Sequence, residues 1–213
     1  MSQDKELTNI DGMSGMERAL KRVGDVLGAL VLLVVLSPVF LYIYIRQRWT
    51  ASGPVIYSQE RVGRGGKPFR IYKFRTMVVD AERDGVPQLE QDDDPRLTEF
   101  GKVLRKRHLD ELPQIWNVLK GDMSIVGPRP HMLAHTEQYS QLIGKFMVRH
   151  FVKPGVTGWA QVTGFRGETK ELWQMEGRVK RDIWYMEHWS IWLDIRIIWM
   201  TFKTFFVHDK NAY

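Results

Sequence analysis

The sequence predicts a mainly helical α+β protein with a membrane-embedded segment, a small β-hairpin and amphipathic helices at the membrane surface. Three observations support this fold class. An uncharged apolar stretch runs from Val26 to Ile45, two short strand-like segments flank a glycine-rich turn at 62–67, and apolar residues recur at helical spacing over much of the remaining chain. The length of 213 residues allows one compact domain with a modest core rather than two domains.

The composition narrows the class of protein and of partner. With 44% hydrophobic and 26% charged residues, the chain is not disordered, collagen-like or a polytopic membrane protein. The net charge of +6 favours an anionic partner, which can be a phosphate-bearing substrate, an anionic lipid or a nucleic acid. The absence of cysteine excludes disulfides, thiolate catalysis and cysteine-ligated zinc, and it fits work on the reducing side of a membrane.

The apolar stretch 26–45 would form a helix about 30 Å long, which matches the hydrocarbon thickness of a bilayer. Ser37 and Pro38 lie inside the stretch, and a proline there removes a backbone hydrogen bond and predicts a bend. Cationic residues flank the stretch on both sides, so the charge bias that orients a spanning helix is nearly balanced. The residues alone therefore leave two interpretations open, a single spanning helix and a re-entrant hairpin whose two ends share one face of the membrane.

A β-hairpin is predicted from residues 54–61 and 68–75 around the glycine turn. The alternative, a phosphate-binding loop, lacks the glycine spacing and the Ser or Thr after Lys67 that a P-loop requires. Residues 1–15 are predicted to be a mobile tail. We interpret the acidic segment 80–96 as a solvated turn rather than as a magnesium site, because consecutive carboxylates rarely converge on one ion.

Helical spacing returns at Glu99, and a second helix is predicted to begin near Asp110 or Glu111 and to end at Gly121. The first of these helices has an apolar face and a strongly cationic face. The segment 126–130 is predicted to be irregular, because two prolines bracket one arginine and fix an extended backbone.

Further helices are predicted at 131–151 and 178–207. Turns are expected at 153–159 and 164–167, with a short strand through Val162 between them. The last helix combines an apolar stripe with several indoles, which favours a membrane interface over a core-facing helix. The stripe consists of Ile191, Ile195, Ile198, Phe202 and Phe205, and the indoles belong to Trp184, Trp189, Trp192 and Trp199.

The adjacent carboxylates Asp110 and Glu111 are the first candidates for chemistry. They follow the basic segment 105–108 and stand at the predicted start of a helix, where unpaired N–H groups and the helix dipole favour negative charge. We therefore expect at least one of them to be ionised and available as a nucleophile or a metal ligand. Taken alone, such a pair is more often an ordinary helix cap.

The sequence from Leu104 to Pro130, which contains this pair, closely resembles the signature of the bacterial sugar transferases, the monotopic phosphoglycosyl transferases. Further similar blocks follow the family order at 72–77, 94–98 and 153–162. Together with 21–25 and the Ser37–Pro38 break, the resemblance covers residues 16–207. One departure is Phe165, which stands where many members of that family have arginine or asparagine.

The resemblance implies an activity and a set of site residues. That family transfers a sugar 1-phosphate from a UDP-sugar to polyprenyl (undecaprenyl) phosphate and releases UMP, through a covalent aspartyl phosphosugar, as the first membrane step of polysaccharide or glycoconjugate synthesis. By this resemblance Asp110 is the nucleophile and Glu111 helps to hold Mg²⁺, which prefers one or two carboxylates together with phosphate oxygens. Arg129 can bind a phosphate in bidentate fashion. The other candidates for phosphate or nucleotide contacts are Lys73, Arg105, Arg166 and Asp182.

The resemblance also implies a division of the chain. Residues 1–15 are the tail, 16–48 a re-entrant hairpin broken at Ser37–Pro38, and 49–213 a catalytic domain on the cytoplasmic face of the bacterial inner membrane. A polyprenyl phosphate keeps its phosphate among the headgroups while the nucleotide sugar is cytosolic, so the active site must lie at that boundary. The sequence does not identify the sugar or the pathway, and it is compatible with a homodimer.

Two hypotheses from other classes compete with this one. A membrane-surface adaptor would use the same cations for anionic lipid, and Asp110 and Glu111 would then be dispensable. Nucleic-acid binding is suggested by the basic segment 105–107, but no helix-turn-helix, zinc-finger or RNA-binding sheet signature is present, so we expect no nucleic-acid partner. The six histidines are too scattered to predict a metal cluster, and we interpret them as ordinary polar or core residues.

Overall fold

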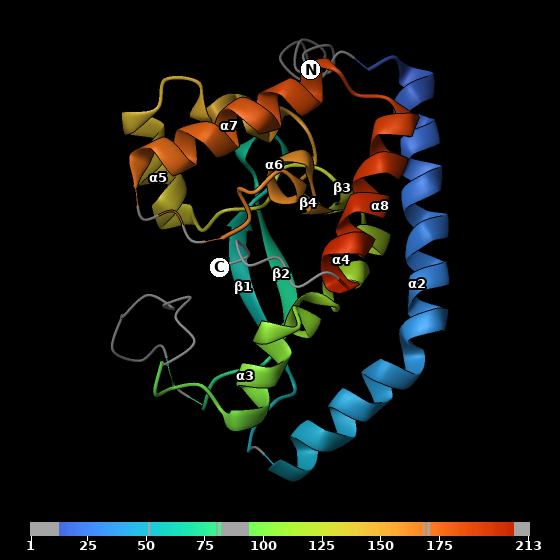
Figure 1. Cartoon of the computed structure of the whole chain (residues 1–213), viewed down its shortest axis with the longest axis vertical. Helices are drawn as coiled ribbons and strands as arrows, with labels where there is room; N and C mark the ends of the chain where they lie inside the picture. Colours follow the sequence, from blue (N-terminus) through green and yellow to red (C-terminus); the bar gives the residue numbers. More distant parts are fainter. Residues whose placement is uncertain are drawn as a thin grey trace.

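The computed structural model shows a mainly helical α+β chain with two small β-sheets and one long N-terminal helix (Figure 1). It describes residues 13–50, 52–79, 81, 94–167, 169 and 171–206. Residues 1–12 of the expected mobile tail and most of the acidic segment, including Asp92 and Asp93, lie outside the described residues, while the last residue of that tail, Gly15, begins a helix. The last residue of that acidic run, Asp94, accepts hydrogen bonds from the Arg96 guanidinium.

The N-terminal helix α2 (Gly15–Thr50) contains the whole uncharged stretch in one continuous helix of 36 residues. Pro38 lies within it, and the Ser37 hydroxyl donates to the Val34 carbonyl at 2.7 Å, an arrangement that bends helices. Figure 1 shows α2 changing direction part-way along its length. Among the described helices, α2 alone is long and apolar enough to cross a bilayer by length and composition. The chain therefore forms one bent helix here, and re-entry into the membrane stays a prediction.

Helix α2 packs along one side of the remaining fold through both of its halves. In the first half, Ala29 joins a buried cluster with residues of α4 (Gln114–Lys120), and the Arg22 guanidinium donates to the carbonyls of Val118 and Leu119. In the second half, Ile43 is buried in a cluster with Phe74 and Leu104. Both ends of the helix thus contact the same body of the protein, while its opposite face stays exposed.

The predicted hairpin is confirmed as strands β1 (Ile56–Val62) and β2 (Pro68–Phe74), which pair antiparallel. The turn between them places Gly65 at φ 67° and Gly66 at φ 75°, a left-handed backbone that glycine adopts without steric cost. Strand β2 contacts the turn 109–111, which carries the carboxylate pair, and Lys73 lies on this strand.

Helix α3 (Glu99–Lys106) begins where predicted, with the Thr98 hydroxyl accepting from the Gly101 amide as its N-cap. The second helix does not begin at Asp110. A single 3₁₀ turn, η3 (Leu109–Glu111), comes first, and α4 (Gln114–Lys120) follows it and ends at Gly121 as expected. The reason is local, because His108 adopts φ 53° and redirects the chain after α3.

The centre of the fold is a parallel pair of short strands, β3 (Ser124–Val126) and β4 (Gly155–Thr157). Two glycines allow the close approach, since a Cβ on Gly155 would lie 2.1 Å from the Gly127 amide nitrogen. The predicted irregular backbone follows β3 at 127–130. The predicted helix 131–151 is wrong, because the chain extends at Ile143 and so divides into α5 (Leu133–Leu142) and η4 (Phe146–Phe151).

The predicted strand through Val162 is also wrong, since Trp159–Val162 forms the short helix α6 and the strand precedes it. The predicted last helix is two helices, α7 (Leu172–Glu187) and α8 (Ile191–Phe206). The Ser190 hydroxyl accepts from the Leu193 amide and starts α8 afresh. The Lys21 ammonium lies 2.5 Å from the Asp194 carboxylate and joins α8 to α2, which run side by side in Figure 1.

Candidate active site

Asp110 lies in η3, which contacts both α3 and β2. Only 8% of the residue is exposed. The left-handed His108 two residues earlier ends α3 and places Asp110 and Glu111 side by side in a tight turn. Because η3 is one turn long, the charge of the pair is not stabilised by a long helix as we expected from the sequence. It is stabilised by side chains from other elements.

Glu111 is held by two cations from separate parts of the chain. The Arg129 guanidinium donates to both carboxylate oxygens, from Nη2 to Oε1 at 2.8 Å and from Nη1 to Oε2 at 3.1 Å. The Lys73 ammonium on β2 donates to Oε1 at 3.0 Å. A bidentate arginine–carboxylate pair fixes both partners in one plane, so the segment after β3 is tied to η3 and, through Lys73, to the hairpin.

The two carboxylates have opposite acid–base properties. The pKa of Asp110 is raised to about 6. Burial is the largest cause of the rise and the negative Glu111 adds to it, while the positive Lys73 acts in the opposite direction. Burial alone would also raise the pKa of Glu111, but the charges and hydrogen bonds of Arg129 and Lys73 hold it well below its usual value. At neutral pH Glu111 is fully ionised, and Asp110 is a desolvated carboxylate that is mostly ionised.

Two further arginines and a histidine lie around the pair. Arg105 on α3 donates from Nε to the Thr76 hydroxyl at 3.0 Å, and its charge lowers the pKa of Asp110. Burial and the positive Arg129 lower the pKa of Arg166, which lies within electrostatic range of both carboxylates. Burial and the Arg166 charge lower the pKa of His108 to about 4, so this imidazole is neutral at pH 7. Four cations therefore surround two carboxylates, and the excess positive charge suits an anion with several phosphate oxygens.

A magnesium ion fits this site only in company with a phosphate ligand. The described residues bring together no group of three or more His, Asp or Glu side chains that could hold a metal by themselves. From the described residues Glu111 Oε2 accepts one hydrogen bond, and a carboxylate oxygen has two lone pairs, so one stays open for a cation. Mg²⁺ commonly takes one or two carboxylates and completes its shell with phosphate oxygens and water.

Comparison with known proteins identifies the family. The family model described as "Bacterial sugar transferase" matches residues 16–208. The chain belongs to the bacterial sugar transferase family. It is 50% identical over 201 residues to the UDP-glucose:undecaprenyl-phosphate glucose-1-phosphate transferase of Escherichia coli (strain K12), a match that covers 94% of this chain and 43% of the relative.

Two more relatives show the range of the family. A transferase of the same name from Caulobacter vibrioides is 42% identical over 91% of this chain and 72% of its own length. A UDP-N-acetylgalactosamine-undecaprenyl-phosphate N-acetylgalactosaminephosphotransferase from Aeromonas hydrophila is 42% identical over 87% of this chain and 43% of its own length. The chain spans less than half the length of the first curated relatives that it matches.

The sugar transferase fold brings six of the seven predicted site residues together: Asp110, Glu111, Lys73, Arg105, Arg129 and Arg166. It does not bring Asp182 into this group. Asp182 lies on α7, 2% exposed, with its Oδ2 2.7 Å from Arg149 Nη2. A direct contact between this carboxylate and a nucleotide or a metal would require that buried ion pair to open.

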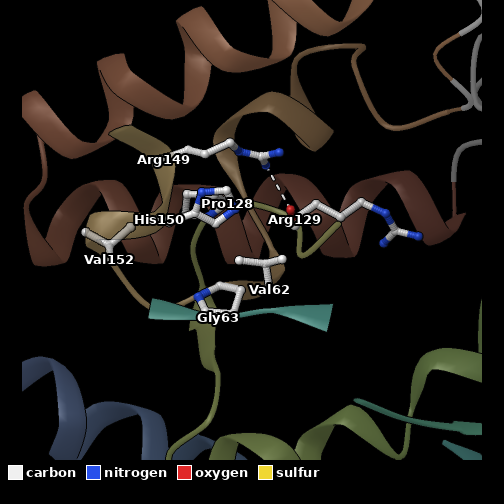
Figure 2. Close-up of a pocket in the computed structure, with 8 residues that line it drawn as sticks. Val62, Gly63, Pro128, Arg129, Arg149, His150 and Val152 are labelled. Atoms are coloured by element: carbon white, nitrogen blue, oxygen red, sulfur yellow. Dashed lines mark hydrogen bonds between the residues drawn. The ribbon is translucent and has the colours of Figure 1, made fainter. Parts of the chain in front are cut away.

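Several polar residues near the site were not found from the sequence. His108 turns the chain at the carboxylate pair, and its only sequence signal was its place beside the pair. His131 and Arg149 are buried, and the Arg149 guanidinium contacts the His131 ring. Arg149 also donates to the Arg129 carbonyl at 2.8 Å (Figure 2). From the sequence we interpreted every histidine as an ordinary polar or core residue, and nothing in the residue spacing distinguished His108 and His131 from the others.

Helices α2 and α8 carry many exposed apolar residues. Four residues of the predicted stripe on α8, Ile191, Ile195, Ile198 and Phe202, are exposed, whereas Leu193 and Ile197 on the opposite side of α8 are buried. Trp192 is 76% exposed, so α8 has one exposed side and one side that packs in the core. The exposed apolar residues on α2 include Leu27, Leu30, Val31, Val34, Val35, Leu41 and Tyr42, and on α8 they are Ile191, Trp192, Ile195, Ile198, Trp199 and Phe202.

Proposed function

We propose that this chain transfers a sugar 1-phosphate from a UDP-sugar to undecaprenyl phosphate and releases UMP. The observation that carries the proposal is the buried Asp110 carboxylate, beside a Glu111 already neutralised by Arg129 and Lys73. The printed names of the relatives supply the two substrates. Because relatives named for glucose and for N-acetylgalactosamine both match, the sugar itself is left to experiment.

In the first step, an Asp110 carboxylate oxygen attacks the phosphorus that bears the sugar. An Asp–O–P bond forms while the P–O bond to UMP breaks, and UMP leaves with the electron pair. A pKa of about 6 leaves most of Asp110 ionised at pH 7, and burial removes much of the hydration that would stabilise the resting carboxylate. The nucleophile is therefore charged, poorly solvated and close to the cations that attract the diphosphate.

In the second step, a phosphate oxygen of undecaprenyl phosphate attacks the same phosphorus. The Asp–O–P bond breaks, Asp110 returns as a carboxylate, and the product is an undecaprenyl diphosphate sugar. The four cations around the pair would offset the charge that builds on the phosphate oxygens in both steps. We assign Glu111 as the protein ligand of Mg²⁺, which when bound neutralises charge on the diphosphate.

The exposed apolar surface supports a location at the membrane interface. Indoles favour the headgroup layer, and those of α8 lie on the same exposed side as its aliphatic residues. Both halves of α2 pack on the body of the enzyme, which is the arrangement expected of a helix that enters and leaves one leaflet. We propose that this leaflet is the cytoplasmic side of the bacterial inner membrane, where the polar nucleotide sugar and the lipid phosphate can meet.

The test is UMP release by the purified full chain with undecaprenyl phosphate and a panel of UDP-sugars. We expect release with at least one sugar, no release by Asp110→Asn, and unchanged release by the control Glu99→Gln, whose carboxylate is exposed on α3. Sustained UMP release by Asp110→Asn would remove this residue as the nucleophile. Vesicle binding without any sugar transfer would favour the membrane-surface adaptor instead.

A further inference from the structure

The two arginines Arg129 and Arg166 carry like charges at one site on irregular backbone. Arg129 follows β3 between two prolines, and Arg166 lies in the turn after α6. The positive charge of Arg129 lowers the pKa of Arg166, which shows that the two guanidinium groups lie within electrostatic range. The charges of Glu111 and Asp110 offset part of their mutual repulsion, and contacts to the backbone of the two loops hold the arginines in addition.

Two buried arginines bind the backbone of these loops. The Arg178 guanidinium on α7 donates from Nε to the Phe165 carbonyl at 3.0 Å and from Nη2 to the Gly167 carbonyl. It thereby bonds the residue on each side of Arg166. The Arg149 guanidinium on η4 donates to the Arg129 carbonyl, and Figure 2 shows the Arg129 side chain extending away from this contact.

The two buried arginines belong to one network. Their Nη1 atoms both contact the ring of His131, with Arg178 Nη1 at 3.2 Å from His131 Nε2. Burial and the charge of Arg149 hold the pKa of His131 well below its usual value, so the ring is neutral and can accept a hydrogen bond. Asp182 supplies the negative charge through its ion pair with Arg149. We call Arg149, Arg178, His131 and Asp182 the buried arginine network.

A steric contact seats the second loop on the same helix. The Phe165 ring lies over Gly177 of α7, where an added Cβ would approach its Cε1 to 2.2 Å. The Arg181 guanidinium lies 3.9 Å from the centroid of the same ring. The Phe165 ring thereby fixes the turn that carries Arg166, whose charge lies within electrostatic range of both carboxylates.

We propose that Arg178 and Arg149 are positioning residues that fix Arg129 and Arg166 at the spacing that a diphosphate requires, with the Phe165 ring on Gly177 as the steric seat of the Arg166 loop. Neither buried arginine contacts substrate, and each acts through the loop whose carbonyls it binds. This inference rests on the proposed function for its diphosphate substrate and for its kinetic readout.

The first test is a double-mutant cycle of Arg178→Lys and Arg166→Gln, measured as kcat/KM for UMP release. Lysine keeps the charge but has no planar fork to reach both carbonyls. We expect Arg178→Lys to lower kcat/KM by about 10- to 100-fold, because displacement of a binding group by about 1 Å costs that much. The double variant should fall little below Arg166→Gln alone, since the arginine that Arg178 positions is already gone. The control Lys180→Gln, an exposed position on α7, should match the wild type.

The proposal would be overturned if the losses in kcat/KM of the two single variants multiply in the double variant. It would also be overturned if the Arg178→Lys enzyme is as active as the wild type. A wild type that releases no UMP would instead overturn the proposed function. Deuterium uptake gives a readout without turnover, and residues 163–167 should exchange faster in Arg178→Lys but not in Lys180→Gln. Unchanged uptake there would contradict the positioning role directly.

A second pair of variants covers the case in which Arg178→Lys does not fold. Gly177→Ala adds a methyl group that must displace the Phe165 ring, so kcat/KM should fall. Adding Phe165→Leu removes the clashing ring atoms and should recover part of the loss. Gly144→Ala is the matched control, because an added Cβ there meets nothing within 4 Å. Full activity of Gly177→Ala, or no recovery in the double variant, would refute the steric seat.

Discussion

Replacing Asp110 by asparagine should stabilise the protein while abolishing its activity. The folded-state pKa of about 6 against the usual 3.8 means that folding disfavours the ionised carboxylate. This difference corresponds to about 3 kcal/mol of stability lost at pH 7.5, and Asn, which carries no charge, recovers it. As the pH rises the unfolded chain ionises first, so the cost is nearly absent at pH 4 and complete above about pH 7.

The assay is thermal unfolding of wild type and Asp110→Asn at pH 7.5 and at pH 4. For a chain of this size, about 3 kcal/mol corresponds to a rise in Tm of about 6 to 12 °C at pH 7.5, which should shrink to about 1 or 2 °C at pH 4. The control Glu99→Gln removes a carboxylate whose side chain is 90% exposed, so its Tm should stay within about 1 °C of wild type. An Asp110→Asn protein no more stable than wild type at pH 7.5, or a gain that is equal at both pH values, would refute the reasoning.

Three further predictions concern the reaction. The kcat/KM for UMP release should fall below a pKa near 6, to about a tenth of its plateau at pH 5, because protonated Asp110 cannot attack; a flat profile from pH 5 to 8 would contradict this. Arg129→Lys should lower kcat/KM by about 10- to 100-fold, since lysine keeps the charge but loses the two-point contact with Glu111, and wild-type kinetics would exclude that role. Chelation of Mg²⁺ should stop UMP release in a steady-state assay without detaching the protein from vesicles, whereas undiminished turnover in chelator would remove the metal.

The parts of the fold that the sequence predicted are those with strong local signals. The glycine turn specified the hairpin, the prolines around Arg129 specified irregular backbone, and Gly121 marked the end of α4. The apolar stripe on α8 was also predicted, because it is a surface property that needs no tertiary partner. In each case the determining interaction lies within a few residues along the chain.

The errors occurred where a single residue interrupts helical spacing or where residues far apart in the chain meet. Helical spacing continued through 131–151 and across 188–190, but Ile143 is extended and Ser190 starts a new helix. His108 adopts a left-handed conformation that no local pattern indicates for histidine. In the site, the carboxylate pair and Arg129 could be found from the sequence because they lie in recognisable local patterns. The role of Asp182 depends on Arg149, 33 residues away, which the sequence does not associate with it.

The most direct test of the account is the mass of the enzyme after incubation with its UDP-sugar in the absence of undecaprenyl phosphate, followed by acid quenching and peptide mapping. We predict that one sugar 1-phosphate is attached at Asp110, that Asp110→Asn acquires none, and that added undecaprenyl phosphate removes the adduct. An adduct at another residue, or unmodified protein under conditions where the donor is consumed once the acceptor is added, would contradict the role of Asp110 as the phosphosugar carrier.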